Sequence, residues 1–119
     1  MGIDYRKKLQ VLQLPTRFTN KLYSDLQYLL QYPIDTLESI ILFGSCARQD
    51  VRLTSDVDIL LITTTPLDRF TRGEISSTLE EDLDKVHTDI IFYTREQFEQ
   101  SERLIAKQIK KEGVILYEK

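Results

Sequence analysis

The spacing of apolar residues predicts two amphipathic helices. Between residues 17 and 31 the apolar side chains follow one helical face, at Phe18, Leu22, Leu26, Leu29 and Leu30. A second helical face follows a loop that contains Gly73, with apolar positions at Ile75, Leu79, Leu83 and Val86. Both segments are therefore expected to pack as helices against a core.

Short runs of β-branched and other apolar residues predict the strands. Three such runs cover residues 38–43, 56–63 and 88–93, and a shorter one covers residues 114–117. Helical patterns separate the first three runs, so strands and helices alternate within one αβ unit. We expect a single domain over residues 1–119.

The two ends of the chain give weaker signals. Residues 3–14 are weakly periodic and end at Pro15, so residues 1–15 form either an N-terminal arm or a short helix. Near the other end, Thr94 and Gln97 have the spacing of a capping box and predict the start of a last helix. Its apolar side is lined by Phe98, Leu104, Ile105 and Ile109, and it stops at Gly113.

Composition excludes several classes of protein. With 119 residues, 41% of them apolar, the chain suits one globular domain, and its longest apolar runs of four residues are too short for a membrane span. The beginning of the chain lacks an apolar signal core and Cys46 is the only cysteine, so we expect a cytoplasmic protein. Basic residues number 16 against 19 acidic ones, which disfavours nucleic acid as the main partner.

The turn after the strand at 38–43 is a candidate anion site. Gly44 permits a sharp bend, so the amides of Ser45 and the following residues are expected to point outward at the start of a helical turn. Ser45 adds a hydroxyl and Arg48 a planar cation, both suited to phosphate oxygens. Taken alone, the segment is explained better as an ordinary tight turn with a solvated Arg48.

Three aspartates form a candidate metal site. Asp56 and Asp58 are two residues apart in a predicted strand, so their side chains share a face, and Asp89 lies in the next predicted strand. If the three converge, each close pair at ~4 Å repels by about 4 kcal/mol at an effective dielectric constant near 20. A divalent cation relieves this repulsion, and carboxylate oxygens favour Mg²⁺ or Mn²⁺. The simpler interpretation is a turn cap, an exposed carboxylate and an unrelated third aspartate, and the neighbouring anion site argues against it.

Cys46 and His87 are weaker candidates. Cys46 adjoins Ser45, but no Gly-x-Ser-x-Gly elbow is present, so we expect a packed side chain behind the turn. His87 is two residues before Asp89 and is interpreted as a surface histidine outside the site.

One segment joins the turn to the first two aspartates: it reads Gly44-Ser45-x-Ala47-Arg48, six further residues, then Ser55-Asp56-x-Asp58 and aliphatic residues. This pattern resembles the signature of the DNA polymerase beta-like nucleotidyltransferase superfamily, especially its minimal members. The short length, the lone third carboxylate and residues 111–117 resemble the same proteins, so the likeness runs from about Leu22 to the end of the sequence. The resemblance implies an α+β nucleotidyltransferase fold, with a small mixed β-sheet flanked by helices.

The resemblance also implies roles for the turn residues. Gly44 and Ser45 would hold the β- and γ-phosphates of ATP, with Arg48 and Ser55 in supporting positions at the nucleotide site. Family members often have glycine directly after the arginine, whereas this chain has Gln49, which places the shape of the loop in question.

By the same resemblance, Asp56, Asp58 and Asp89 would be catalytic and would bind two Mg²⁺ ions, or Mn²⁺ in their place. The implied reaction moves a nucleoside monophosphate, expected to be AMP from ATP, to a hydroxyl and releases pyrophosphate. The usual partner of the minimal family is a small helical HEPN-type toxin, which the transferase neutralises as an antitoxin. Homo-oligomers and hetero-oligomers are both compatible with this.

Two alternatives remain open at this stage. One is a binding module with a degenerate nucleotide site that neutralises a partner by docking, which Gln49 favours and the three retained aspartates oppose. The other is a small antibiotic nucleotidyltransferase, which would need a second chain to build its drug pocket.

Overall fold

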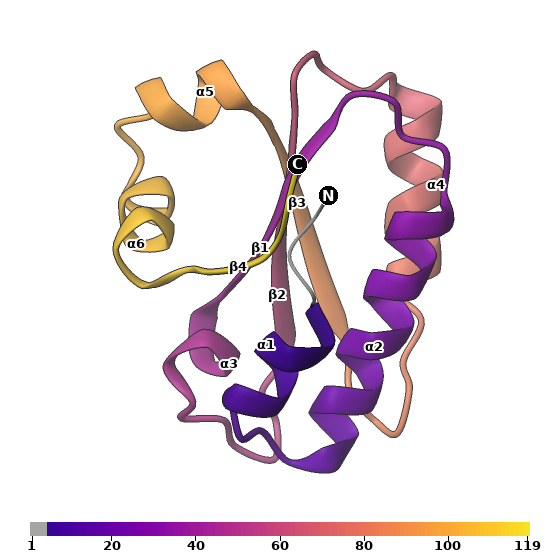
Figure 1. The fold of residues 1–119 in the computed structure, drawn as a ribbon, viewed down its shortest axis with the longest axis vertical. Helices are drawn as coiled ribbons and strands as arrows, with labels where there is room; N and C mark the ends of the chain where they lie inside the picture. The colour runs from indigo at the N-terminus through magenta and orange to yellow at the C-terminus, as the bar shows by residue number, and fades with distance from the viewer. Residues whose placement is uncertain (1–4) are drawn as a thin grey trace.

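The computed structural model describes residues 5–119, which form one four-stranded sheet with helices on both faces (Figure 1). Its elements are α1 (Tyr5–Val11), α2 (Thr16–Gln31), β1 (Leu37–Phe43), α3 (Gly44–Arg48), β2 (Val57–Thr63), α4 (Arg69–Leu79), β3 (Thr88–Thr94), α5 (Arg95–Gln100), α6 (Leu104–Glu112) and β4 (Val114–Glu118). Within residues 5–119, none of the helices is both long and apolar enough to span a membrane.

The sheet is mixed and has the strand order β3-β2-β1-β4. β1 pairs antiparallel with both β2 and β4, whereas β2 and β3 run parallel. Consequently the end of β1 and the beginnings of β2 and β3 lie at the same end of the sheet. This mixed sheet flanked by helices confirms the predicted α+β class.

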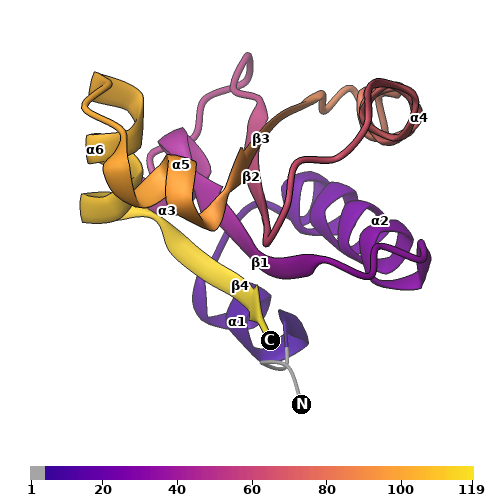
Figure 2. The same ribbon diagram turned by 90° about the horizontal axis from the view of Figure 1, so that it is seen from above.

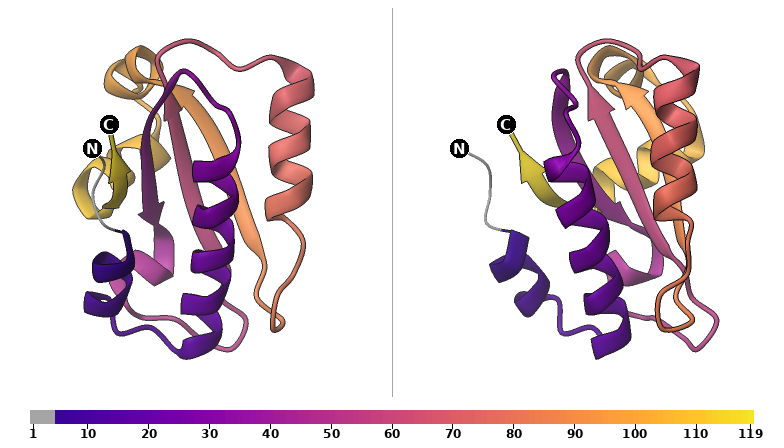
Figure 3. Two further views of the ribbon diagram at one scale, coloured as in Figure 1. Left: turned by 45° about the vertical axis from the view of Figure 1, so that its right-hand side comes forward. Right: turned by 90° about the vertical axis from the view of Figure 1, so that its right-hand side faces the viewer.

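Two apolar layers hold the sheet in place. α1, α2 and α4 bury their apolar sides on one face, and α5 and α6 cover the other (Figure 2). Neighbouring residues of β2 point to opposite layers: Ile59 and Leu61 pack with the first, Leu60 and Ile62 with the second. α2 and α4 lie side by side along their face (Figure 3), where Lys21 of α2 donates a hydrogen bond to the carbonyl of Leu79.

The N-terminal segment contains a short helix, α1, over Tyr5–Val11. Leu9 and Leu12 are buried against the sheet, which explains the weak periodicity of this segment. Residues 1–4 of the predicted arm lie outside the described residues.

The prediction that the second amphipathic helix reaches Val86 is wrong. α4 ends at Leu79, and Leu83 and Val86 instead form an isolated antiparallel bridge. Between them Asp84 and Lys85 both have positive φ, 52° and 64°, as in the two-residue turns that close tight hairpins. The predicted apolar face therefore combined two residues of a helix, Ile75 and Leu79, with two residues of the tight turn that follows it, Leu83 and Val86.

The predicted last helix is divided into α5 and α6. The capping box of Thr94 and Gln97 is present and starts α5, as expected. The chain then becomes extended at Ser101, whose hydroxyl accepts a hydrogen bond from the amide of Arg103 and so competes with helix continuation. α6 ends at Glu112, with Gly113 as its C-cap, which matches the predicted stop at Gly113.

Candidate active site

The end of β1 and the beginnings of β2 and β3 lie side by side at the predicted site. Asp58 is the second residue of β2, with Phe43 at the end of β1 as its partner on one side and Asp89 of β3 on the other. Residues paired across neighbouring strands point to the same face, so the carboxylates of Asp58 and Asp89 emerge side by side. Asp56 directly precedes β2, one residue outside the predicted strand position.

Gly44 connects the turn to this carboxylate pair. Its φ is +73°, in the left-handed region that favours glycine, as the predicted sharp bend requires. A Cβ added at this position would collide with Oδ2 of Asp58. The backbone of the turn and the carboxylate of Asp58 therefore lie in direct contact, with no room for a side chain between them.

The turn continues into a short helix. α3 begins at Gly44, and its first amides have no side-chain cap among the described residues. At the other end Gln49 has φ 61° and ψ 34°, a left-handed conformation, and its amide bonds back to the carbonyls of Ser45 and Cys46. Gln49 thus adopts the conformation that glycine adopts most readily, and the loop keeps its turn.

Burial and the neighbouring carboxylates act together on the carboxyl of Asp58. Burial, then the neighbouring Asp89 and Asp56, raise the pKa of its carboxyl from 3.8 to about 6, while Arg48 opposes the shift. Three carboxylates that repel one another beside a glycine cradle are a donor set that suits Mg²⁺ or Mn²⁺. As the side chains stand, no three His, Cys, Asp or Glu residues within 5–119 are arranged to hold a metal ion. The residues fit such an ion only if a carboxylate turns toward the others.

His87 lies against Asp89, although the sequence interpretation favoured a surface histidine outside the site. Its Nε2 lies 3.3 Å from Oδ1 of Asp89 and its Nδ1 lies 2.9 Å from Oδ1 of Asp82. The hydrogen bond to Asp82 and the charges of Asp89 and Asp56 raise the pKa of the imidazole, although partial burial opposes them. The two-residue spacing between His87 and Asp89 was the available signal.

Arg48 and Ser55 make contacts within the protein. Arg48 donates to the carboxylates of Asp50 and of Glu112 in α6, at 3.4 and 3.3 Å, so it links the turn to the helix behind it. The hydroxyl of Ser55 accepts a hydrogen bond from the amide of Arg52 at 2.7 Å and closes the loop before Asp56. Both residues thereby fix the shape of the site, and their predicted part in nucleotide binding stays a prediction.

Cys46 is packed behind the turn, as expected. Its side chain is buried, and Sγ lies 3.6 Å from the carbonyl oxygen of Asp56. Burial, with smaller effects from nearby aspartates, raises the pKa of the thiol to about 12, so almost no reactive thiolate is present at neutral pH.

A buried polar network fixes the start of β3. Lys21 of α2 donates to Asp25 at 2.6 Å and to the carbonyl of Leu79 at 2.7 Å, and the hydroxyl of Thr88 donates to the second oxygen of Asp25. Burial raises the pKa of Asp25, although both donors oppose the shift. Thr88 precedes Asp89, so this network anchors the strand that carries the third carboxylate. Sequence reasoning missed it, although Lys21 and Asp25 lie within the apolar stripe of α2.

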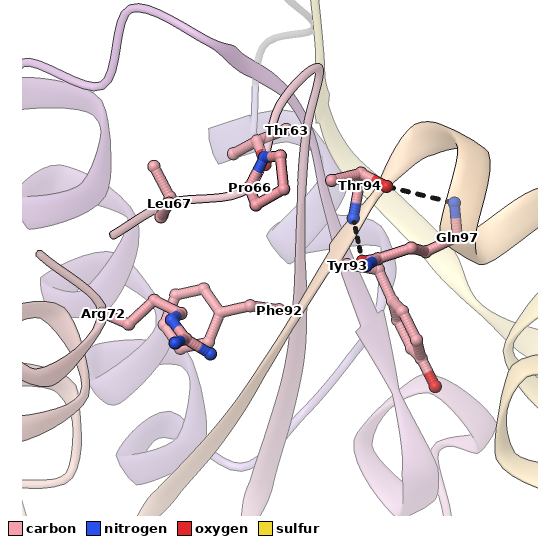
Figure 4. Close-up of a pocket in the computed structure, with 8 residues that line it drawn as sticks. All are labelled: Thr63, Pro66, Leu67, Arg72, Phe92, Tyr93, Thr94 and Gln97. Carbon is pink, nitrogen blue, oxygen red and sulfur yellow. Dashed lines mark hydrogen bonds between the residues drawn. The ribbon is translucent and has the colours of Figure 1, made fainter. Parts of the chain in front are cut away.

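Of two cavities of similar size, one adjoins the predicted site residues and the other lies away from them. One of about 140 Å³ adjoins Gly44 and lies between α3 and α6, with Phe43, Ile105 and Ile109 in its wall. Another of about 140 Å³ includes Thr63 and Thr94, the last residues of β2 and β3 (Figure 4). Since the carboxylates are at the beginnings of these strands, the second cavity lies at the opposite end of the sheet.

Comparisons with known proteins agree with this fold. A family model described as "Polymerase beta, Nucleotidyltransferase" matches residues 27–119. A solved structure of a toxin–antitoxin with AMP-PNP is 25% identical, with a TM-score of 0.61 over 80% of this chain and 72% of that one. No curated protein matches the chain.

Two more distant solved structures show the fold alone. One contains a tri-AMPylated Shewanella oneidensis HEPN toxin in complex with an MNT antitoxin, at 21% identity and a TM-score of 0.56, covering 83% of this chain and 73% of that one. The other, described as a nucleotidyltransferase from Sulfolobus solfataricus, is 20% identical, with a TM-score of 0.53 over 97% of this chain and 87% of that one.

Proposed function

This chain belongs to the polymerase beta nucleotidyltransferase family, and on that premise we propose that it transfers AMP from ATP to a hydroxyl of a partner protein. The observation that carries the proposal is the position of Asp58, which lies against Gly44 of the turn and is paired with Asp89 of the neighbouring strand. Backbone amides suited to phosphates and carboxylates suited to metal ions would thereby be within reach of one bound triphosphate.

Each residue has a role in this reaction. The turn at Gly44 and Ser45 presents backbone amides to the β- and γ-phosphates, at the positive end of α3. Asp56, Asp58 and Asp89 would hold two Mg²⁺ ions, or Mn²⁺ in their place. When bound, such ions activate the acceptor oxygen and neutralise charge on the leaving pyrophosphate. Asp89, whose side chain is 52% exposed, would lie on the acceptor side and receive the proton of the attacking hydroxyl.

The proposed acceptor is a HEPN-type toxin, with this chain as its antitoxin. The 25% identical structure is a toxin–antitoxin with AMP-PNP, and the Shewanella oneidensis structure contains a tri-AMPylated HEPN toxin, which supports this choice of nucleotide and partner. A partner chain would also supply the acceptor-binding surface.

The proposal is tested by mass spectrometry of the partner. The protein is incubated with Mg²⁺, ATP and the product of the adjacent reading frame, and we expect the partner to gain the mass of one or more AMP groups. The Asp56→Asn, Asp58→Asn double variant should give no adduct. Arg72→Ala, which alters the cavity at the opposite end of the sheet, is the matched control and should act like the wild type. An unmodified partner with the wild type would contradict the transfer reaction.

A docking module is the second candidate. It is favoured by the engagement of Arg48 with Asp50 and Glu112, and of the Ser55 hydroxyl with Arg52, which leaves the supporting positions occupied by protein contacts. If the double variant neutralised the partner as well as the wild type does, without any adduct, docking would account for the function. Neutralisation that depends on the two aspartates supports transfer.

A further inference from the structure

β3 is an edge strand, and its outer side carries backbone groups that no other strand pairs with. It pairs only with β2, and the amide of Val57 in β2 donates to the carbonyl of His87 at 2.8 Å. In parallel strands every second residue bonds to the same neighbour, so the odd-numbered residues of β3 bond to β2. Ile90 and Phe92 therefore turn their N–H and C=O groups to the open edge, and no group within residues 5–119 bonds to these two amides.

The open edge of β3 is regular and lacks the features that usually block pairing with a further strand. All seven residues of β3 pair with β2 without a bulge, and residues 88–94 include no Lys, Arg or Pro. At the other edge of the sheet, β4 pairs with β1 through a register that shifts between Ile40 and Ile41. The edge of β3 is therefore the better template for an added strand.

A strand added to β3 would continue the row of paired residues that forms the proposed site. Phe43, Asp58 and Asp89 are partners across β1, β2 and β3, and neighbouring strands lie about 4.8 Å apart. The residue opposite Asp89 would stand at the next place in this row, with its side chain on the same face. This face is accessible, because the side chain of Asp89 is 52% exposed and α4 packs on the opposite face of β3. A hydroxyl at this place would lie beside the carboxylate that is proposed to receive its proton.

We propose that the open edge of β3 binds an extended segment of the acceptor protein as an added strand and places a hydroxyl residue of that segment opposite Asp89. The inference rests on the proposed function, because it requires Asp89 to serve an acceptor hydroxyl. In this kind of recognition the backbone hydrogen bonds supply affinity, and the alternate side chains supply specificity. The hydroxyl residue is thus selected by its register along β3.

Charge at the start of β3 narrows the chemistry of the segment. The loop before β3 has four exposed acidic residues and one exposed basic residue: Glu80, Glu81, Asp82, Asp84 and Lys85. Complementary charge favours a partner segment with Lys or Arg at the end that lies next to this loop. The segment is therefore expected to carry a hydroxyl residue flanked on one side by basic residues.

Hydrogen exchange of single amides, followed by NMR, tests for the added strand. The isotope-labelled protein is mixed with the product of the adjacent reading frame without nucleotide, so that no transfer occurs. The amides of Ile90 and Phe92 should exchange at least about tenfold more slowly in the complex than in the free protein, because a hydrogen-bonded amide exchanges only after local opening. The amides of Asp89 and Ile91 already bond to β2 and should change less.

Proline at position 92 tests the same contact by removing a donor. Edge strands tolerate proline where the N–H faces solvent. Phe92→Pro should weaken binding of the partner at least about tenfold in isothermal titration calorimetry, because an acceptor of the partner is left unpaired. Phe92→Ala keeps the amide and loses a side chain that packs on the core beneath α4, so this matched control should bind within about threefold of the wild type.

Mass spectrometry of the same partner with Mg²⁺ and ATP separates this inference from the proposed function. A partner that gains AMP while Ile90 and Phe92 exchange as fast as in the free protein would overturn the inference alone. Equal binding by Phe92→Pro and the wild type would overturn it too, and if this variant does not fold, the exchange rates of the wild type decide. Protection of the two amides that grows with the concentration of the free protein would also overturn it, because a second copy would then occupy the edge. A partner that neither binds nor gains AMP would overturn both.

Discussion

Gln49 holds a backbone conformation that is costly for a residue with a side chain. Its φ of 61° ends α3, and the left-handed region costs most L-residues about 1 to 2 kcal/mol. Because glycine loses more backbone entropy on folding, we expect Gln49→Gly to raise the free energy of unfolding by only about 0.5 to 1 kcal/mol. Urea denaturation measures the gain. Gln13→Gly, at φ 53° after α1, is the matched control and should give a similar gain far from the site. A destabilised Gln49→Gly would mean that its side chain contributes contacts that outweigh the strain.

Asp58 should destabilise the metal-free protein above pH 6. Its folded pKa of about 6 exceeds the ordinary value of 3.8, so between these pH values the unfolded chain has lost a proton that the folded protein still binds. Stability therefore falls as the pH rises through this window and stays lower above it. Solvent screens a half-buried group, so we expect Asp58→Asn to stabilise the metal-free protein by about 1 to 2 kcal/mol at pH 7.5.

Thermal unfolding without metal, at pH 7.5 and at pH 3.5, tests this expectation. At pH 3.5 the carboxyl of Asp58 is protonated in the folded protein and mostly protonated in the unfolded chain, so the two proteins should unfold with nearly equal free energies. A stabilisation of equal size at both pH values would show that packing, and not charge, is responsible. The same variant should lose the rise in melting temperature that Mg²⁺ with ATP gives the wild type by mass action.

Contacts between elements depend on the buried network of Lys21, Asp25 and Thr88. Removing one member of a buried ion pair leaves an uncompensated charge and typically costs about 3 to 5 kcal/mol, so Lys21→Met should destabilise strongly. Lys21→Met combined with Asp25→Leu removes both charges and should cost less than Lys21→Met alone. Urea unfolding of the two variants measures this difference. Additive losses in the double variant would show that the two residues do not act as a pair.

At the scale of elements, the sequence predicts which helices and strands form better than it predicts where they end. Hydrophobic periodicity located α2 and apolar runs located the strands, because burial of an apolar face determines those elements, whereas the capping box of Thr94 and Gln97 located the start of α5. Periodicity carried the second helix past Leu79 because Leu83 and Val86 repeat at helical spacing, while the positive φ values of Asp84 and Lys85 have no apolar signature. Periodicity also predicted α5 and α6 as one helix, because the hydrogen bond of the Ser101 hydroxyl is a local effect that apolar spacing does not reveal.

The candidate site was predictable to the extent that it depends on local sequence. The glycine turn and the spacing of Asp56 and Asp58 are local. Asp56 lies just before β2, so strand alternation alone does not place both side chains on one face. The parallel register that pairs Asp58 with Asp89 joins segments 31 residues apart, and only the fold supplies it. The contact of His87 with Asp89 and the engagement of Arg48 with α6 depend on side-chain directions, which spacing alone does not determine.

At the scale of the whole molecule, the two ends of the sheet should respond differently to nucleotide. The carboxylates and the Gly44 turn lie at the end where β2 and β3 begin, whereas the cavity of Figure 4 lies where these strands end. Binding of Mg²⁺ with AMP-PNP should therefore slow amide hydrogen exchange in residues 44–48, 56–58 and 88–90, because a ligand that binds the native state suppresses local opening. Residues 63–67 and 92–97 should exchange at unchanged rates.

One variant at each end of the sheet shows where the nucleotide binds. Asp58→Asn should abolish the protection near the turn, whereas Arg72→Ala, at the wall of the other cavity, should leave it intact. Protection centred on residues 63–67 and lost in Arg72→Ala would place the nucleotide at the opposite end of the sheet, and the roles assigned to the three aspartates would then be wrong. Protection at both ends that Asp58→Asn removes together would instead indicate that β2, which joins the two ends of the sheet, transmits the effect of binding as a rigid element.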